Sequence, residues 1–243
     1  MDENPAGPGT RAGRQLPLAL RYPPDQRLET FAGDRALPLQ LRQFAGGGAG
    51  RTLLLVGPAG SGKTHLALAA CAEAEAAGLR AAYLPLATTP GRLREAVEAM
   101  HAFDLVALDG LEAVAGEPGD ELALFDFHNR MHDAGRRLLY TARVAPDALG
   151  LRLPDLRSRL GQCTRAVLEP LDDAGRRDLL RLRARRRGLQ VDEAAIEWLL
   201  RRADRDPASL TRLFEQLDVA ALAAQRRLTV PFLRSVLGGA GDA

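Results

Sequence analysis

Four features are scarce in this 243-residue chain, and each scarcity excludes a class of protein. The two cysteines, Cys71 and Cys163, are too few and too far apart for a disulfide framework or a cysteine metal site, so we expect a reducing, cytoplasmic environment. Aromatic residues are 5% of the chain, which predicts a core of Leu, Ala and Val. No apolar run is long enough to cross a bilayer. The net charge of +2 is too small to indicate nucleic-acid binding by itself.

The first twenty residues have no regular pattern of a folded domain. Residues 1–14 are rich in Gly and Pro and lack the apolar segment of a secretory signal, so we expect a disordered tail. Residues 15–20 form a short Leu-rich stretch, and Tyr22-Pro23-Pro24 then interrupts any regular structure. A folded domain is therefore expected to begin near residue 21.

Between residues 21 and 170, short apolar runs alternate with segments of helical spacing. Strands are expected at 52–56, 80–86, 105–108, 137–141 and 166–168. Helices are expected at 35–44, 90–100, 120–134 and 156–160, and in the Ala-rich segment that follows the Gly-rich loop and ends at about residue 77. The run at 52–56 is continuously apolar, as in a strand buried on both faces. This alternation predicts an α/β fold with a doubly wound parallel sheet.

The remainder of the chain, residues 171–243, shows no strand pattern. Apolar residues recur at helical spacing over 172–187, 192–202 and 207–224, and a last short helix is expected from Val230. The sequence therefore predicts a small all-α domain after the α/β domain.

A phosphate-binding loop is the most specific motif in the chain. Eight residues match G-x-x-x-x-G-K-S/T without departure: Gly57, Pro58, Ala59, Gly60, Ser61, Gly62, Lys63 and Thr64. Glycines let backbone N–H groups surround phosphates, and the following helix directs the positive end of its dipole at them. We expect Lys63 to contact the β/γ-phosphates and Thr64 to ligate Mg²⁺. An ordinary Gly-rich turn is the alternative, and the position between a strand and a helix argues against it.

A second Mg²⁺-side group is expected at the end of a neighbouring strand. Asp109 follows the buried run 105–108 and fits this role, with a solvated strand-end Asp as the alternative. Position 110, where many nucleotide hydrolases of this kind carry a water-orienting acid, is Gly110. Glu112 is near, and a capping or surface role suits it at least as well. The sequence therefore predicts nucleotide binding with weak intrinsic hydrolysis.

Several short segments, each weak alone, occur in the order and spacing of one known family. They are Gln15–Leu20, Asp109–Gly116, Leu124–Arg130, Leu153–Leu160, Leu182–Gly188 and Ala224–Phe232. Together they resemble the DnaA-related family of AAA+ ATPases, and within it the short regulatory inactivators of DnaA. The resemblance runs from Gln15 to about Leu237. It implies an AAA+ P-loop NTPase domain followed by a helical lid domain.

The resemblance also implies a function and partners. Such proteins bind ADP or ATP with Mg²⁺ and the DNA polymerase sliding clamp, and they stimulate hydrolysis of the ATP held by DnaA while the clamp is on DNA. They are thereby negative regulators of replication initiation, cytoplasmic and associated with the nucleoid through the clamp. Contact with DNA is then indirect, no membrane is involved, and homo-oligomerisation stays open. Only a short tail precedes the ATPase domain and the chain ends soon after the lid, which favours a regulator over the initiator.

The resemblance assigns two sites outside the phosphate loop. The first is a clamp-binding peptide over residues 15–20, in which the contacts are made by Gln15, Leu16, Leu18 and Leu20. An extended peptide can place spaced leucines in a groove while the amide fixes its orientation. Packing of these leucines on their own domain is the alternative. The second site is Arg159, at the position of an arginine finger that acts in trans, with a surface salt bridge as its alternative.

Two positions depart from the family pattern. Arg143 stands where an Asp is expected for the polar group called sensor 1, and Thr141 is the nearest polar substitute. Ala208 stands at the arginine called sensor 2, and Arg212, one helical turn later, could reach the nucleotide instead.

Four further interpretations remain to be weighed at the level of sequence. An autonomous AAA+ ATPase, such as a helicase loader, is disfavoured by Gly110, and a small nucleoside kinase is disfavoured by the all-α segment and Arg159. The pair His128 and His132 lacks a third ligand for zinc. The basic run 176–187 is expected to be a solvated face of the lid, with DNA contact as the alternative.

Overall fold

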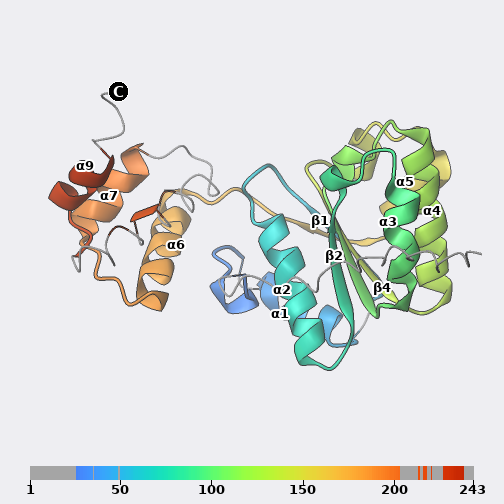
Figure 1. Cartoon of the computed structure of the whole chain (residues 1–243), viewed down its shortest axis with the longest axis horizontal. Coiled ribbons are helices and arrows are strands. Elements are labelled where there is room, and N and C mark those ends of the chain that lie inside the picture. The colour runs from blue at the N-terminus through green and yellow to red at the C-terminus, as the bar shows by residue number, and fades with distance from the viewer. Residues whose placement is uncertain are drawn as a thin grey trace, which may run out of the picture.

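A computed structural model describes residues 26–34, 36–48, 50–202 and 227–237, together with positions 213, 216, 217 and 220. Figure 1 shows two bodies, an α/β domain and a smaller helical domain, joined by the segment that leaves the sheet after residue 167.

The α/β domain is built on one five-stranded parallel sheet in the order β2-β3-β4-β1-β5. Its strands are β1 (Thr52–Val56), β2 (Ala81–Pro85), β3 (Leu105–Asp109), β4 (Arg137–Ala142) and β5 (Thr164–Val167). The strand order reverses direction beside β1, so the sheet is doubly wound. In such sheets, ligands bind at the carboxyl ends of the strands where the order reverses. That edge lies between β1 and β4 here.

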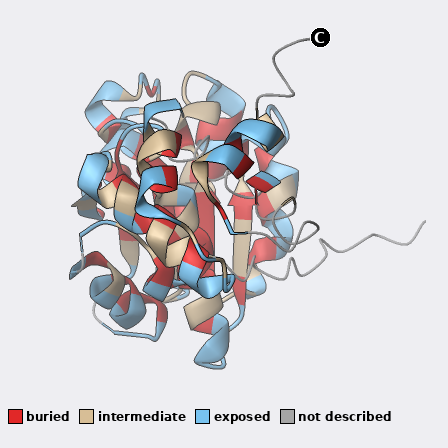
Figure 2. Ribbon diagram, turned by 90° about the vertical axis from the view of Figure 1, so that its left-hand side faces the viewer, coloured by how far each residue is buried: buried red, intermediate tan, exposed pale blue. Residues whose placement is uncertain are grey.

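Helices cover both faces of the sheet. One face carries α1 (Ala36–Ala45) and α2 (Lys63–Ala76), whose apolar residues form one core cluster with the sheet. The other face carries α3 (Leu93–Glu98), α4 (Pro118–Asp133) and α5 (Pro154–Gly161), in a second cluster. Buried residues lie along the sheet and the inner sides of these helices (Figure 2). Short 3-10 helices connect the elements: η1 (Leu28–Thr30), η2 (Leu86–Thr88), η3 (Ala99–Ala102), η4 (Leu111–Ala113) and η5 (Pro146–Ala148).

The helical domain has a core of its own. Its described helices are α6 (Asp173–Arg186), α7 (Glu193–Arg202) and α9 (Val230–Leu237). Their apolar faces pack together around Leu180, Ile196, Leu199 and Leu233. The Asp172 side chain accepts a hydrogen bond from Gly175 N (2.7 Å) and so caps α6 at its first turn.

Several boundaries differ by a few residues from those expected from the sequence. Helix α3 begins at Leu93 instead of residue 90, and β5 spans 164–167 instead of 166–168. The helix expected over 207–224 falls mostly outside the described residues. In the parts of the chain that are described, no helix is both long and apolar enough to span a membrane.

Candidate nucleotide site

The phosphate loop, residues 57–62, connects β1 to the first turn of α2 at the carboxyl edge of the sheet. Gly57 N donates to Ala142 O at the end of β4 (3.1 Å), which fixes the start of the loop. Gly62 has φ of +95°, and a Cβ there would come within 2.7 Å of the Phe31 ring. Both facts require glycine at position 62. The loop therefore has the backbone geometry that its motif predicts.

Lys63, the only lysine among the 33 Lys and Arg residues, is half-buried at the start of α2. Its ammonium donates to the carbonyl oxygens of Gly57 and Pro58, each at 2.7 Å. Burial lowers the pKa of Lys63, while the nearby carboxylates of Glu112 and Asp109 raise it in part. A compact charge on a flexible stem is thus held within the loop, close to two acids.

Asp109 is held by three hydroxyl groups from three different elements. Thr64 Oγ1 donates to Asp109 Oδ2 at 2.8 Å, and the Tyr83 hydroxyl donates to the same oxygen at 2.7 Å. Thr141 Oγ1 donates to Asp109 Oδ1 and accepts from Gly110 N at 2.9 Å. Burial, followed by the hydrogen bond to Asp109, raises the pKa of Tyr83 well above its ordinary value. The expected pair of Thr64 and Asp109 is therefore in direct contact.

Two members of this network were not anticipated in these roles. Tyr83 lies on β2, beside β3. Nothing in the sequence around Tyr83 indicates that its hydroxyl donates a hydrogen bond to Asp109. Thr141 is the next-to-last residue of β4, on the other side of β3. It is Thr141, and not Arg143, that lies against Asp109. Arg143 is exposed in the loop after β4. Only the strand order β2-β3-β4 brings these hydroxyls together, and that order cannot be read from one strand.

Position 110 is constrained by its backbone. Gly110 has φ of +89°, in the left-handed region that favours glycine, and its N–H is bound to Thr141. Glu112, two residues further on, accepts a hydrogen bond from the backbone N–H of Arg143. Its carboxylate is therefore already engaged in joining the loop after β3 to the loop after β4.

Replacing Gly110 with alanine should lower the free energy of unfolding by about 1–2 kcal/mol, because a Cβ is strained in this left-handed conformation. Gly119→Ala is the matched control, since Gly119 lies in α4 with no atom near an added Cβ and has ordinary φ. Urea unfolding of both variants measures the difference. Equal stabilities for the two variants would show that position 110 is not strained.

A cleft of about 410 Å³ lies between the phosphate loop, the helical second domain and residues 26–34, which precede α1 and are called the N-terminal segment below. Lys63 and Thr64 line one wall, Thr30 and Phe31 a second, and α6 a third. Lid residues on that wall are Leu179 and Arg183, and Leu171 comes from the linker. Its volume falls in the range of small-molecule sites, roughly 300–1,000 Å³.

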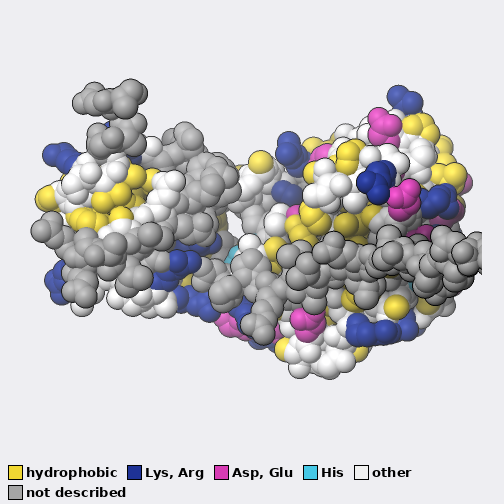
Figure 3. All heavy atoms as spheres, viewed as in Figure 1, with side chains coloured by type: hydrophobic (Ala, Val, Ile, Leu, Met, Phe, Trp, Pro, Cys, Tyr) yellow, Lys and Arg dark blue, Asp and Glu magenta, His cyan; other side chains and the backbone are white. Residues whose placement is uncertain are grey.

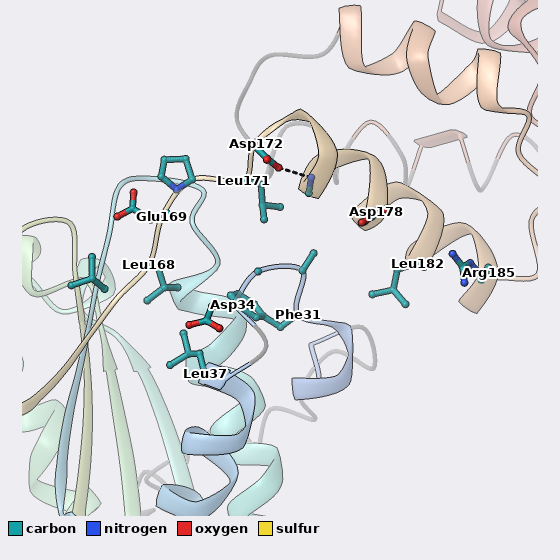
Figure 4. Close-up of a pocket in the computed structure, with 15 residues that line it drawn as sticks. Phe31, Asp34, Leu37, Leu168, Glu169, Leu171, Asp172, Asp178, Leu182 and Arg185 are labelled. Carbon is teal, nitrogen blue, oxygen red and sulfur yellow. Dashed lines mark hydrogen bonds between the residues drawn. The ribbon is translucent and has the colours of Figure 1, made fainter.

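A second cavity of about 760 Å³ adjoins the cleft beyond Phe31. Leu171 from the linker and Phe31 from the N-terminal segment both extend into the space between the domains (Figure 4). The acids Asp34, Glu169 and Asp178 also line it. Phe31 thus separates an apolar and acidic cavity from the phosphate loop.

The N-terminal segment is attached to the phosphate-loop helix. His65 Nε2 donates to the carbonyl oxygen of Arg27 at 2.8 Å, and the rings of Phe31 and His65 lie 6.0 Å apart. His65, one residue beyond Thr64, therefore holds the wall formed by Thr30 and Phe31 against α2. No motif in the sequence marks these residues as part of the site.

The residues present fit a nucleotide with a divalent cation. The first-turn N–H groups of α2 and the Lys63 ammonium suit phosphates, and the Thr64 hydroxyl and Asp109 carboxylate are oxygen ligands of the kind Mg²⁺ prefers. Phe31, Leu171 and Leu179 offer apolar surface for a base. The cleft can therefore bind charge at one end and a flat apolar group at the other.

Arg159 lies far from this cleft in sequence, on the exposed side of α5. Its guanidinium has no ion-pair or hydrogen-bond partner among the described residues. Burial first, and the charge of nearby Arg159 second, lower the pKa of His128 of α4 to about 4. The exposed position suits a contact with another molecule.

Several expected site residues cannot be placed. Gln15, Leu16, Leu18 and Leu20 of the N-terminal peptide, and Arg212 and Ala208 of the lid, lie outside the described residues. His128 Nδ1 lies 3.0 Å from the Tyr140 hydroxyl. No group of three or more potential metal ligands occurs in the described ranges, so the zinc alternative for His128 and His132 finds no third ligand there.

The basic run of the lid is partly neutralised. Arg177 pairs with Glu197 (2.6 Å), and Arg181 pairs with both Asp178 and Glu193. On the face drawn in Figure 3, Lys and Arg side chains are spread over both domains. These pairs favour the solvated lid face over a DNA contact for this part of α6.

Comparison with known proteins gives one family match and several similar folds. Residues 173–237 match the family model described as "Hda, lid domain". Domain III of the replication initiation protein DnaA from Thermotoga maritima superposes with a TM-score of 0.77 at 20% identity, over 90% of this chain and 98% of that one. AMPPCP-bound DnaA from Aquifex aeolicus gives 0.68 at 20% identity, over 80% and 65%.

A motor protein has a similar fold. The RuvB Holliday junction branch migration motor of Thermotoga maritima gives a TM-score of 0.65 at 18% identity, over 89% of this chain and 72% of that one. The parallel sheet order, the phosphate loop and the helical second domain agree with the fold class expected from the sequence. The chain therefore has a fold similar to that of DnaA domain III, and its second domain matches the Hda lid domain.

Proposed function

We propose that this protein is a negative regulator of replication initiation that binds an adenine nucleotide and the DNA-loaded sliding clamp, and promotes hydrolysis of ATP bound to DnaA. The observation that carries the proposal is the match of residues 173–237 to the Hda lid domain. The core supports it as well, because its fold is similar to that of domain III of the initiator DnaA. The regulator acts on the nucleotide of its partner.

Adenine nucleotide is the proposed ligand of the cleft. One of the DnaA structures of similar fold contains AMPPCP, an ATP analogue. Lys63 and the phosphate loop would hold the phosphates, and Thr64 and Asp109 would hold Mg²⁺, which neutralises phosphate charge when bound. Tyr83 and Thr141 orient the Asp109 carboxylate toward Thr64. Arg183 of the lid lines the cleft and supplies a positive charge on the side opposite Lys63.

Slow intrinsic turnover follows from the loop after β3. Gly110 carries no side chain, and the Glu112 carboxylate is bound to the backbone of Arg143. Neither position therefore offers a free carboxylate to orient a water molecule, and the bound nucleotide acts mainly as a structural ligand. An autonomous ATPase would instead turn over at rates usual for enzymes, roughly 1 per second or faster.

The catalytic contribution is proposed to come from Arg159, in trans. A guanidinium placed against the γ-phosphate of a partner stabilises charge that develops during hydrolysis. Arg159 is exposed on α5 and has no partner among the described residues, so forming this contact would break no internal ion pair. The reaction is then completed at the interface with DnaA.

The clamp is proposed to bind the N-terminal peptide. Replacing Gln15, Leu16 and Leu18 together with alanine should weaken clamp binding by about 10²-fold, since each anchor lost costs about 1 kcal/mol. Surface plasmon resonance on immobilised clamp measures the change. Leu39→Ala is the matched control, because Leu39 is 61% exposed on α1 of the folded domain.

Unchanged clamp affinity in the triple variant would remove this peptide from the proposal. Loss of affinity in Leu39→Ala would instead assign the contact to the surface of α1.

The whole function is tested by hydrolysis of ATP prebound to DnaA, with clamp loaded on DNA, in the presence and absence of this protein. Stimulation that needs both the protein and the loaded clamp is the expected result.

A further inference from the structure

Glu121 is a fully buried acid that connects helix α4 to two loops. Its side chain is 0% exposed. Oε1 accepts a hydrogen bond from Gly116 N at 2.7 Å. Oε2 accepts from Leu153 N at 2.7 Å and from Arg152 N at 2.9 Å. No cationic side chain is bound to this carboxylate in the described part of the chain, so its charge is met by backbone N–H groups alone.

One of the two loops leads to the proposed Mg²⁺ site at Asp109, and the other leads to helix α5, which carries Arg159. Gly116 closes the loop that begins at Asp109, beside the Mg²⁺ ligands. Arg152 and Leu153 lead into α5, and Leu153 is the N-cap of that helix without a capping side chain of its own. Glu121 therefore supplies from α4 the acceptor that the N-cap N–H receives in a capping box from a Glu or Gln at the third helical position, which is Leu156 here. The negative charge also suits the positive end of the α5 dipole.

We propose that Glu121 is the positioning residue for Arg159, which rests on the proposed function of Arg159 as a finger in trans. Leu156 and Leu160 hold the buried face of α5, but apolar packing is not directional. The hydrogen bonds at Arg152 and Leu153 fix where the helix starts. Arg159 follows the N-cap by six residues, about 9 Å along the helix axis, so a shift of the start is carried to the guanidinium.

The adjacent acid provides a matched comparison. Asp120 is 3% exposed and also accepts only backbone N–H bonds, from Gly91 (2.7 Å) and Leu93 (3.2 Å). It fixes the start of α3, not α5. Asp120 and Glu121 thus both accept backbone N–H bonds at the start of a helix, α3 for Asp120 and α5 for Glu121. Only α5 carries Arg159.

The test compares Glu121→Gln with Asp120→Asn. Each amide keeps the shape of its acid but replaces one acceptor with an NH₂ group that can only donate, so a backbone N–H loses its partner. Stimulation of DnaA-bound ATP hydrolysis should fall by about 10²-fold for Glu121→Gln, as expected for a misplacement near 1 Å, and should stay within about twofold of wild type for Asp120→Asn. Nucleotide affinity should be unchanged in both.

Amide hydrogen exchange supplies a readout that does not depend on DnaA. In Glu121→Gln, exchange at Arg152 and Leu153 and along α5 should be at least about tenfold faster, with α3 unchanged. In Asp120→Asn the pattern should be reversed. Equal loss of stimulation in both variants would overturn the proposal, because it would show a general loss of structure. Full stimulation by Glu121→Gln would overturn it as well.

Failure of the proposed function has a different signature. If wild-type protein gives no stimulation, Arg159 is not a finger for DnaA, and Glu121 is then judged by exchange alone. Faster exchange confined to α5 in Glu121→Gln would still support the positioning of α5 by Glu121. Unchanged exchange at Arg152 and Leu153 would overturn it.

Discussion

Lys63→Ala should weaken nucleotide binding by about 10²-fold or more, because hydrogen bonds to a charged group contribute roughly 1.5–3 kcal/mol each and Lys63 can make more than one to phosphates. Isothermal titration with ADP and ATP measures the loss. The fold should survive, since Lys63 is only half-buried and lies at the start of α2, outside the apolar clusters. Lys63→Arg is the comparison, because the planar guanidinium cannot replace a compact ammonium within the loop.

The composition of the chain allows a second measurement at the same residue. Lys63 is the only lysine, so an amine-selective reagent has one side-chain target in addition to the α-amino group. Saturating ADP should protect Lys63 from modification, read by mass spectrometry of the peptide that contains it. Equal modification with and without nucleotide, together with wild-type affinity in Lys63→Ala, would place the nucleotide elsewhere.

Arg159→Ala should reduce stimulation of DnaA-bound ATP hydrolysis by at least about 10²-fold, given that arginine fingers contribute about 10³ to 10⁵ in well-studied nucleotide hydrolases. Nucleotide and clamp affinities should not change, because Arg159 is exposed and lies outside both the cleft and the N-terminal peptide. Arg159→Lys should fail as well, since an ammonium lacks the planar fork. The measurement is release of labelled phosphate from DnaA in single turnover.

Arg157→Ala is the control for this substitution. Arg157 is also exposed on α5, but two residues along a helix correspond to about 200° of rotation, so the two side chains leave opposite sides. Arg157 lines a shallow hollow with Pro146 and Arg165, whereas Arg159 lies toward His128. Loss of stimulation in Arg157→Ala with full activity in Arg159→Ala would transfer the finger to Arg157.

The sequence predicted those parts of the molecule that depend on local pattern. The phosphate loop has an invariant spacing, and its place between β1 and α2 was expected. Asp109 contacts Thr64 at the same edge of the sheet, although β3 is separated from β1 by β4 and is not the neighbouring strand that was expected. The match of the second domain to an Hda lid domain agrees with the family resemblance.

Features that depend on contacts between distant elements were not predicted. Tyr83 reaches Asp109 only because β2 pairs with β3, and α3 starts at Leu93 because Asp120 of α4 accepts its first N–H groups. The shift of β5 has a related cause, since its first residues, Thr164 and Arg165, are exposed at a sheet edge and carry no apolar signal. Polar side chains that meet across elements leave no periodic trace in a sequence.

The most direct test of the account is a single assay with three components. ATP is bound to DnaA, the clamp is loaded on DNA, and hydrolysis is followed after addition of this protein in its ADP-bound form. The account predicts hydrolysis that requires the protein, the loaded clamp and Arg159, with little turnover by the protein alone. Stimulation that persists without the clamp or with Arg159→Ala, or rapid turnover of ATP by the protein itself, would contradict it.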